Sequence, residues 1–398
     1  MIYQTEVLRP AEFVERRDRF TVRWRDGSRT CRAHVANPGR MGEILLPGTT
    51  VLLGRRPHTK SGWEAVGASW KGRWPGDGPR TVFLNTVAVN RLARRLLEER
   101  LVPELVGYEV VRAEIPLGRS RIDFLLEGAR RPYLLEVKSV TLVERGLALF
   151  PDAETARGRR HILELAGRPR EYDAGVLFLV QGEADRFLPD FHNDLEFARA
   201  FRSVAGRVDF LPYRLDPVLT GEGRIRFAGR PERLHIPWDL LDAGLSDGGV
   251  YLLLLEIPRR RVVPVGSLGR QAFPRGWYVY VGSAKRGLSR RVARHLRRRK
   301  KIHDHVDALR EVAKSVKALP IRAAPVGECQ LAGEVGRIAS GEVRRFGCSD
   351  CRCGSHLFYF PGPVLSTASF QEMLVRLRHG VSPVSPVAGD DGAARVKL

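Results

Sequence analysis

The stretch RIDFLLEGARRPYLLEVKS, residues 121–139, decides the fold that the sequence predicts. It reads as two strands, 121–127 and 133–139, joined by a turn that contains Gly128 and Pro132. Glu136 and Lys138 are two residues apart on the second strand, so their side chains share one face. If the hairpin folds about its middle, Asp123 on the first strand lies opposite Glu136, with Cβ atoms about 5 Å apart. The pattern therefore predicts a cluster of two carboxylates and one ammonium.

Two carboxylates at that separation can hold a hard divalent cation, and Mg²⁺ or Mn²⁺ is the expected ion. The Lys138 ammonium could orient a water or neutralise charge that develops on a phosphate. The competing interpretation is a surface salt bridge on an exposed sheet face, because the pattern is short and surface ion pairs are common. The residues alone leave both interpretations open.

The composition indicates a partner of negative charge. The chain has 398 residues, which suggests two or three domains, and a formal net charge of +22. That excess favours nucleic acid, DNA ahead of RNA, over an anionic membrane surface. No apolar run is long enough for a membrane-spanning helix, the start lacks a signal peptide, and five cysteines do not suggest a secreted disulfide scaffold. We therefore expect a soluble cytoplasmic protein without a membrane partner.

Residues 1–80 are predicted to form short strands separated by turns, of which Asp26-Gly27 is the clearest hairpin signal. About five short strands in this length are typical of a small OB-like barrel. Such barrels bind single strands through positive charge and aromatic stacking. The residues that could do so here are Lys60, Trp63, Trp70, Lys71, Arg73 and Trp74. Core and rim packing explains the same residues equally well.

Residues 81–215 are predicted to form an α/β domain with a mixed sheet. Helices are expected at 82–101, 155–167 and 194–204, and strands at 108–116, 174–180 and 208–213 flank the two central strands. The apolar run at 174–180 is typical of a buried parallel strand. Helical crossovers place helices over both faces of such a sheet.

This order, with aspartate on the second strand and Glu-x-Lys on the third, resembles the PD-(D/E)XK nuclease fold. Five ordered motifs narrow the resemblance to the sugar fermentation stimulation protein family over roughly residues 1–230. They are HVANPGRM (34–41), NTVAVNR (85–91), SRIDFLL (120–126), EVKSVTL (136–142) and FPDAETARGRRHILEL (150–165). The resemblance implies an OB-like domain before a nuclease-like domain, DNA binding and a regulatory role.

The same resemblance implies roles for particular residues. Asp123 and Glu136 would be metal ligands and Lys138 the catalytic lysine. Asp152, Thr155, Arg157 and His161 would shape a phosphate site, with Arg157 and His161 contacting nucleic acid. Capping and turn chemistry is the competing explanation for Asp152 and Thr155.

Residues 216–247 are expected to be a linker with one short strand at 224–228, followed by a second module at 248–362. Strands are predicted at 249–257 and 277–281, and the spacing of Leu288, Val292 and Leu296 predicts a helix. Ten of the 17 residues at 285–301 are Lys or Arg, and none is acidic. The polar face of the predicted helix is therefore almost purely cationic, and a bound polyanion explains such a face better than exposure to solvent does. We expect Lys285, Arg290, Arg294 and Arg298 to contact nucleic acid.

The segments GVY, YVGSA and LSRRVARHL, in this order, resemble the GIY-YIG nuclease pattern. Together with VGSLGRQAFPRGWYVYVGSA (265–284), KKIHDHVDAL (300–309) and FGCSDCRCGSHLFYF (346–360), they are similar to uncharacterised GIY-YIG-like domains. By position Tyr251, Tyr280 and Arg291 match the motif, and His295 lies one turn later. A tyrosine or histidine could deprotonate water, and an arginine could stabilise the phosphorane.

The resemblance also requires a metal-binding glutamate on a later helix. Glu328 and Glu334 are the candidates. Gln330 stands where the pattern has a second acid, which puts metal binding and activity of this module in doubt.

Cys348, Cys351, Cys353 and His356 lie within nine residues and supply four soft ligands, so Zn²⁺ is chemically compatible. A reduced structural cluster or a disulfide is the alternative. Residues 363–398 are expected to form a helix and then a disordered tail.

The sequence as a whole predicts a multidomain protein: an OB-like barrel, a PD-(D/E)XK nuclease-like domain and a GIY-YIG-like domain. The favoured function is a Mg²⁺- or Mn²⁺-dependent nuclease that acts on DNA or RNA. The alternative is a non-catalytic, DNA-binding regulator.

Overall fold

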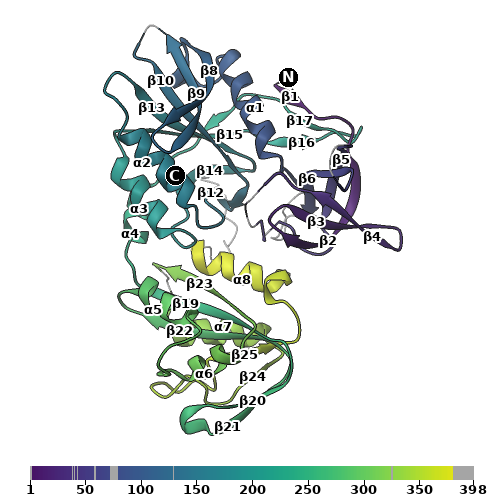
Figure 1. Cartoon of the computed structure of the whole chain (residues 1–398), viewed down its shortest axis with the longest axis vertical. Coiled ribbons are helices and arrows are strands. Elements are labelled where there is room, and N and C mark those ends of the chain that lie inside the picture. Colours follow the sequence, from purple (N-terminus) through teal and green to yellow (C-terminus); the bar gives the residue numbers. More distant parts are fainter. Residues whose placement is uncertain are drawn as a thin grey trace, which may run out of the picture.

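The computed structural model describes residues 2–379 except residues 38, 40, 43, 58–59, 72–78, 129 and 324–325. Two residues predicted to stack on or bind nucleic acid, Arg73 and Trp74, and the tail from residue 380 lie outside this part, as does the side chain of Lys71. The chain forms a barrel beside an α/β domain, with a separate C-terminal module below them (Figure 1). Within the described ranges no helix is long and apolar enough to span a bilayer.

The N-terminal strands form a closed barrel. The bridge between β4 and β6 closes strands β2 to β6, and β7 adds to the outside of β6. The β3–β4 hairpin forms where the Asp-Gly signal predicts a turn, but Asp26 pairs with Arg29, so the two-residue loop is Gly27-Ser28, in which Gly27 adopts a positive φ of 59°. The interior is filled by Phe13, Val22, Trp24 and other apolar side chains. The strands are β2 (Arg9–Asp18), β3 (Thr21–Asp26), β4 (Arg29–His34), β5 (Thr50–Arg55), β6 (Trp63–Lys71) and β7 (Pro79–Phe83).

The α/β domain is built on a six-stranded mixed sheet in the order β18-β15-β13-β10-β9-β8. Strands β10, β13 and β15 are parallel, and β8, β9 and β10 form an antiparallel meander. The expected order of helices and strands is observed, and β13 is buried as its apolar run predicts. The elements are α1 (Thr86–Glu98), η1 (Pro103–Leu105), β8 (Tyr108–Leu117), β9 (Ser120–Gly128), β10 (Tyr133–Val140), α2 (Ala156–Ala166), β13 (Asp173–Val180), α3 (Leu195–Val204), β15 (Asp209–Arg214) and β18 (Glu232–Arg233).

Helices cover both faces of this sheet. On one face Ile162 and Leu165 of α2 and Phe197 and Phe201 of α3 pack against the alternate residues of β10, β13 and β15. On the other face α1 packs through the stripe that its period predicts, including Leu92. Three short strands, which the sequence analysis did not resolve, form a separate small sheet: β11 (Leu142–Glu144), β12 (Gly146–Phe150) and β14 (Ala184–Pro189).

The segment 216–247, expected to be a linker with one strand, is more structured than predicted. It contributes β16 (Pro217–Leu219), β17 (Ile225–Phe227), β18 and α4 (Trp238–Gly244). Strand β17 pairs with β1 (Tyr3–Gln4), so the beginning of the chain is held by residues more than 200 positions later. Several backbone groups of this segment are therefore hydrogen-bonded within the folded domain.

The C-terminal module is an antiparallel sheet in the order β23-β19-β22-β25-β24. Helices α7 and α8 cover one face, and α5, α6 and the β20–β21 hairpin cover the other. That hairpin occupies the long spacing between the two aromatic tripeptides. The elements are β19 (Gly249–Ile257), β20 (Arg261–Pro264), η2 (Gly266–Leu268), β21 (Arg270–Phe273), β22 (Gly276–Ala284), α5 (Leu288–Leu296), α6 (His305–Val312), β23 (Ser315–Arg322), α7 (Glu328–Ile338), β24 (Gly341–Glu342), β25 (Leu357–Phe360), η3 (Val364–Ser366) and α8 (Ala368–His379).

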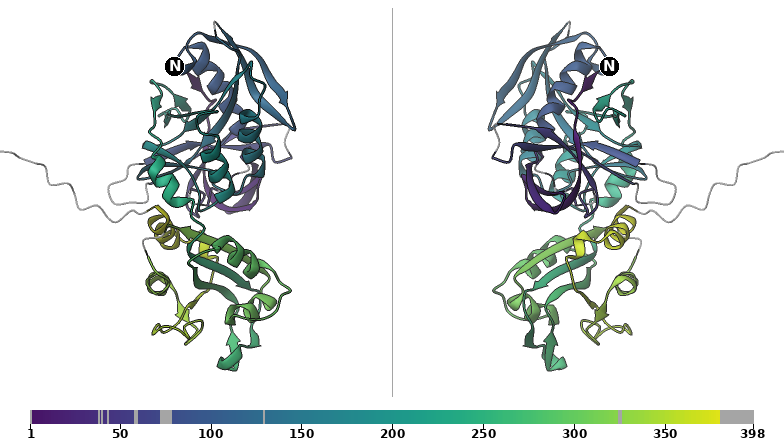
Figure 2. Two further views of the ribbon diagram at one scale, coloured as in Figure 1. Left: turned by 90° about the vertical axis from the view of Figure 1, so that its left-hand side faces the viewer. Right: turned by 90° about the vertical axis from the view of Figure 1, so that its right-hand side faces the viewer.

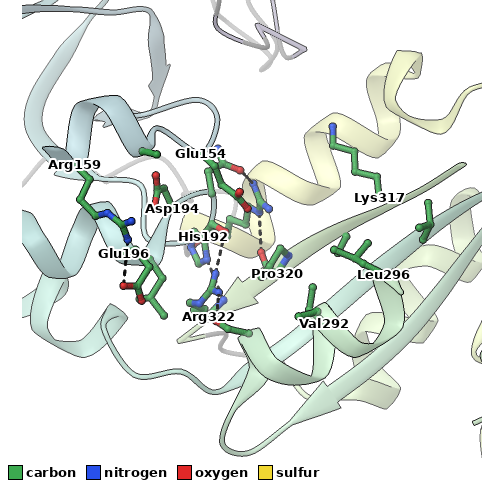
Figure 3. A pocket seen from close by; sticks show the side chains of 18 residues that line it. Glu154, Arg159, His192, Asp194, Glu196, Val292, Leu296, Lys317, Pro320 and Arg322 are labelled. Atoms are coloured by element: carbon green, nitrogen blue, oxygen red, sulfur yellow. Dashed lines mark hydrogen bonds and ion pairs between the residues drawn. The ribbon is translucent and has the colours of Figure 1, made fainter. Parts of the chain in front are cut away.

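The C-terminal module meets the α/β domain at the end of β23 and at α8 (Figure 2). The buried Arg322 guanidinium donates through one nitrogen to the carbonyls of Phe191 and His192, at 2.9 and 3.0 Å. Arg378 on α8 donates to Asn193 Oδ1 at 2.9 Å. Beside these contacts lies a cavity of about 620 Å³, with Arg159 and Glu196 on one wall and Val292 and Leu296 on the other (Figure 3).

Candidate active site

The β9–β10 hairpin brings Asp123 and Glu136 together in the predicted register. Leu135 pairs with Phe124, so one further step along the ladder sets Glu136 opposite Asp123. There the Val137 N–H donates to Asp123 Oδ2 at 2.8 Å, so a side-chain carboxylate takes the place of a backbone carbonyl as its acceptor. The hairpin therefore ends where the candidate site begins.

Asp123 is held by a helix that sequence reasoning did not connect with it. Asn90 on α1 donates its amide N–H to Asp123 Oδ1 at 2.7 Å. Burial and the neighbouring Glu136 carboxylate raise the pKa of Asp123 to about 6, although the hydrogen bonds from Val137 and Asn90 act in the other direction. The folded protein therefore places two negative charges close together at neutral pH.

Glu136 is only 2% exposed, which rules out the interpretation of a salt bridge on an exposed face. Its Oε1 atom accepts a hydrogen bond from the Lys138 ammonium and lies 2.5 Å from His161 Nδ1. Burial raises the pKa of Glu136, but Lys138 and the hydrogen bond from His161 outweigh it and lower the pKa. The other oxygen, Oε2, is buried and has no hydrogen-bond partner among the described residues.

His161 is oriented by hydrogen bonds on both of its nitrogens. Arg157 Nε lies 3.2 Å from His161 Nε2. A guanidinium can only donate, so Nε2 accepts and the proton of a neutral ring sits on Nδ1, directed at Glu136. Arg157 and His161 thus belong to the site. The expectation that His161 contacts nucleic acid is corrected, because His161 is 1% exposed and instead orients the Glu136 carboxylate.

Helix α2 carries these two residues, and its start is fixed by capping. Thr155 Oγ1 accepts the Gly158 N–H at 2.9 Å, which confirms the capping explanation for Thr155. Asp194, the cap of α3, also accepts the Thr155 N–H at 2.7 Å. Asp152 does not cap the helix; its carboxylate accepts the Met41 N–H of the barrel at 3.2 Å.

Two of the tryptophans proposed for stacking, Trp63 and Trp70, pack within the barrel. Trp63 packs on Trp24 with ring centroids 5.8 Å apart, and the Arg55 guanidinium lies 4.1 Å from its ring. Trp70 packs against the barrel core. For these two tryptophans the packing explanation is the one observed, while Lys60 is exposed near the start of β6.

The C-terminal module also gathers its predicted residues. His295 Nε2 lies 3.0 Å from the Tyr251 hydroxyl, and Arg291 Nε donates to that hydroxyl at 3.3 Å. The Tyr280 ring lies 6.4 Å from the Tyr251 ring. Burial raises the pKa of Tyr251 to about 12, although Arg291 opposes the shift. His295 Nδ1 lies 3.3 Å from the Asp307 carboxylate, so the Tyr251 proton is directed toward His295.

The basic helix α5 is partly compensated, which corrects the expectation of an almost purely cationic face. Asp304 and Asp307, at the start of α6, form ion pairs with Arg294, and Asp307 also pairs with Lys300. His295, Asp304 and Asp307 lie close enough together to hold a metal ion, but these ion pairs already engage both carboxylates. A groove of about 650 Å³ remains along the helix, lined by Lys285, Arg286, Arg290, Arg291, Arg294 and Arg297. Arg298 does not line it.

The predicted cysteine cluster is wrong in one member. Cys348 is buried, and its sulfur lies 4.0 Å from the Gly354 carbonyl. Cys329, on the first turn of α7, takes its place beside Cys351, Cys353 and His356. Burial and the two neighbouring thiols raise the pKa of Cys353 to about 12.

The two glutamates considered as metal ligands are both engaged. Glu328 accepts hydrogen bonds from His356 and Ser283, and these outweigh burial and lower its pKa. Glu334 pairs with Arg337 and Arg376 at 2.5 Å.

Asn90 and Cys329 are the functional candidates that the sequence analysis missed. Asn90 lies within the motif NTVAVNR (85–91). It is a polar residue that forms helices weakly, and it lies beside the apolar stripe of α1, which is the signal that could have identified it. Cys329 had no such signal, because it lies 22 residues from Cys351 and meets it only through the packing of α7.

Three parts of the chain match known protein families. Residues 14–75 match the SfsA N-terminal OB domain, residues 87–220 the sugar fermentation stimulation protein RE domain, and residues 250–378 a domain of unknown function, DUF123. A sugar fermentation stimulation protein homolog from Methanothermobacter thermautotrophicus is 40% identical over 210 residues, covering 51% of this chain and 84% of the relative. One from Moorella thermoacetica is 39% identical over 218 residues, covering 52% and 90%. The structure of Pyrococcus furiosus SfsA in complex with Ca²⁺ matches with 26% identity and a TM-score of 0.52, over 59% of this chain and 98% of that one.

Proposed function

Because the chain belongs to the sugar fermentation stimulation protein family, we propose that Asp123, Glu136 and Lys138 form a metal-dependent phosphodiesterase site that cleaves DNA or RNA. The remaining parts of the chain would bind the nucleic acid. In this proposal the domain at 87–220 has the PD-(D/E)XK nuclease arrangement, with the carboxylates on β9 and β10 and the lysine on β10.

One observation carries the proposal: Glu136 Oε2 is buried without a hydrogen-bond partner in the described part of the chain, next to a second carboxylate. An unsatisfied buried carboxylate oxygen costs about 1–3 kcal/mol or more unless another group binds it. A divalent cation held by Asp123 and Glu136 would satisfy that oxygen and remove the repulsion between the two carboxylates. The donor set of two carboxylates suits Mg²⁺ or Mn²⁺.

The neighbouring residues prepare this arrangement. Asn90 and the Val137 N–H fix the Asp123 carboxylate, and His161 fixes Glu136 so that Oε2 is the free atom. A bound cation would supply Lewis acidity toward a phosphate oxygen and lower the pKa of a water. The Lys138 ammonium, half-buried on the same strand face, would orient the attacking water or neutralise charge on the phosphate.

Three further observations support the proposal. The Pyrococcus furiosus relative was solved with Ca²⁺, a cation that prefers oxygen ligands as Mg²⁺ does. The barrel matches an OB domain, a fold that often binds single strands. The net charge of +22 fits a polyanionic substrate.

The test is cleavage of labelled single- and double-stranded DNA and RNA by the full chain with Mg²⁺, Mn²⁺ or EDTA. We expect metal-dependent cleavage that Glu136→Gln and Lys138→Ala each reduce at least 100-fold. The matched controls are Glu127→Gln, an exposed glutamate on β9, and Lys314→Ala, which removes only an exposed ion pair with Glu256. Equal activity in Glu136→Gln and wild type would refute the assignment.

We also assign nucleic-acid binding to the C-terminal module, with a GIY-YIG-like arrangement of Tyr251, Tyr280 and Arg291. The cation-lined groove along α5 supports this part of the proposal. Replacing both Arg290 and Arg297 by alanine should weaken binding uniformly across sequences and reduce the slope of log K against log salt by about 2. Arg259→Ala, at an exposed turn, is the control and should leave the slope unchanged.

A non-catalytic regulator is the alternative, and the cationic groove is compatible with it. If the wild-type chain binds nucleic acid with EDTA or metal alike and cleaves none of the four substrates, the chain is a binding protein. Loss of binding in the double arginine variant would then define its nucleic-acid surface.

A further inference from the structure

Four soft donor groups converge in the C-terminal module, outside the proposed phosphodiesterase site. Cys329 lies on the first turn of α7, Cys351 and Cys353 in the segment 343–356, and His356 just before β25. Their sulfur and imidazole nitrogen atoms all lie within 4.8 Å of one another, and none of the cysteines forms a disulfide. Three of the four come from a segment of turns and bends that is itself without helix or strand.

The spacing agrees with a tetrahedral zinc centre. With Zn–S of about 2.3 Å and Zn–N of about 2.0 Å, tetrahedral angles place a ligand nitrogen and a ligand sulfur about 3.5 Å apart. His356 Nε2 lies 3.5 Å from Cys351 Sγ. The two atoms are thus at the distance they would have if they shared one cation.

The orientation of His356 is an independent observation. His356 is 1% exposed, and its Nδ1 lies 2.9 Å from Glu328 Oε1. A carboxylate only accepts, so Nδ1 carries the proton and the Nε2 lone pair faces the thiols. Histidines that ligate metals usually donate their other N–H to a carboxylate in this way. Ser283 on β22 donates to the second oxygen of Glu328 and fixes that carboxylate in turn.

We propose that Cys329, Cys351, Cys353 and His356 bind one Zn²⁺, and that Glu328 positions the histidine. Four protein ligands leave no open position, so the site is structural rather than catalytic. It fastens the segment 343–356 to the start of α7 and, through Glu328 and Ser283, to β22. This assignment does not depend on the proposed nuclease activity.

The experiment measures zinc in the full chain purified without chelator, by elemental analysis and by mercurial release into a chromophoric chelator. We expect about one zinc per wild-type chain. Cys329→Ser, at an exposed position where the fold should tolerate serine, should lose it. Cys348→Ser is the matched control, because Cys348 is not a member of the cluster, and it should keep its zinc. After exchange with Co²⁺, the wild type should show tetrahedral ligand-field bands with thiolate charge transfer. Cys329→Ser, loaded with excess Co²⁺, should show weaker charge transfer because one thiolate is missing.

Glu328→Gln tests the positioning role. At saturating zinc it should still hold about one equivalent, with affinity weakened roughly 10- to 100-fold. Three outcomes would overturn the assignment: no zinc in wild type even after reconstitution, loss of zinc in Cys348→Ser but not in Cys329→Ser, or a disulfide among the three cysteines in the reduced, freshly purified chain.

Discussion

Asp123 lies in an environment that disfavours its negative charge. Its carboxyl has a pKa of about 6 in the folded chain against 3.8 for an ordinary aspartate, because it is buried beside Glu136. The folded state therefore binds this proton more tightly than the unfolded state does. The carboxyl has no net effect below about pH 4, destabilises the fold increasingly as the pH rises to about 6, and has a constant effect above it.

Asp123→Asn should therefore stabilise the metal-free chain in a pH-dependent manner. In EDTA, the free energy of unfolding of the variant relative to wild type should rise by up to about 3 kcal/mol between pH 4 and pH 7. Thermal or urea denaturation at several pH values measures this difference, with Asp185→Asn, at an exposed carboxylate, as the control. At pH 7.5, Mn²⁺ should stabilise wild type and not Asp123→Asn. A difference that does not change with pH would contradict the argument.

At this same scale, the sequence predicted the carboxylate–lysine cluster because strand alternation and one turn fix all three positions. It could not predict the support that comes from elsewhere. Asn90 on α1 forms a hydrogen bond with Asp123, and His161 on α2 forms one with Glu136. Those contacts depend on how helices lie on the sheet, which no local pattern specifies.

Helix α2 links the candidate site to the rest of the α/β domain, and its first turn depends on Thr155. The hydroxyl accepts the Gly158 N–H, so Thr155→Ala should leave that donor unsatisfied and cost about 1 kcal/mol. Amide hydrogen exchange in the first turn of α2 should then become about fivefold faster, as local opening becomes easier. Thr155→Ser keeps the hydroxyl and should exchange at nearly the wild-type rate. Equal protection in the alanine variant would show that the cap contributes nothing.

The helices of the α/β domain were predictable because each carries an apolar stripe of helical period. The segment 216–247 shows the limit of this reasoning. Its strands are two or three residues long, too short to display a period, and β17 is held by pairing with both β1 and β16. The absence of a local pattern therefore predicts a linker, although the segment is folded.

At the scale of the whole molecule, Arg322 joins the C-terminal module to the α/β domain. Besides the carbonyls of Phe191 and His192, it donates to Ser289 Oγ at 3.0 Å. Arg322→Met keeps much of the buried volume but removes every one of these donors. We expect a larger radius of gyration in small-angle scattering and faster proteolysis around residues 245–248. Arg259→Met, at an exposed turn, should scatter like wild type, and an unchanged radius in Arg322→Met would show that other contacts suffice.

The pairing of β1 with β17 has a consequence for the chain as it is made. The backbone amide of Ile2 donates to Phe227, and that of Leu8 donates to Gly223. A ribosome adds roughly 5–20 residues per second, so the first strand waits roughly 10–45 s for its partner to be synthesised. Until then β17 does not exist, so β1 stays unpaired while the barrel strands β2 to β6 are already available to fold. The pairing of β1 with β17 thus cannot form before residue 227 has been synthesised.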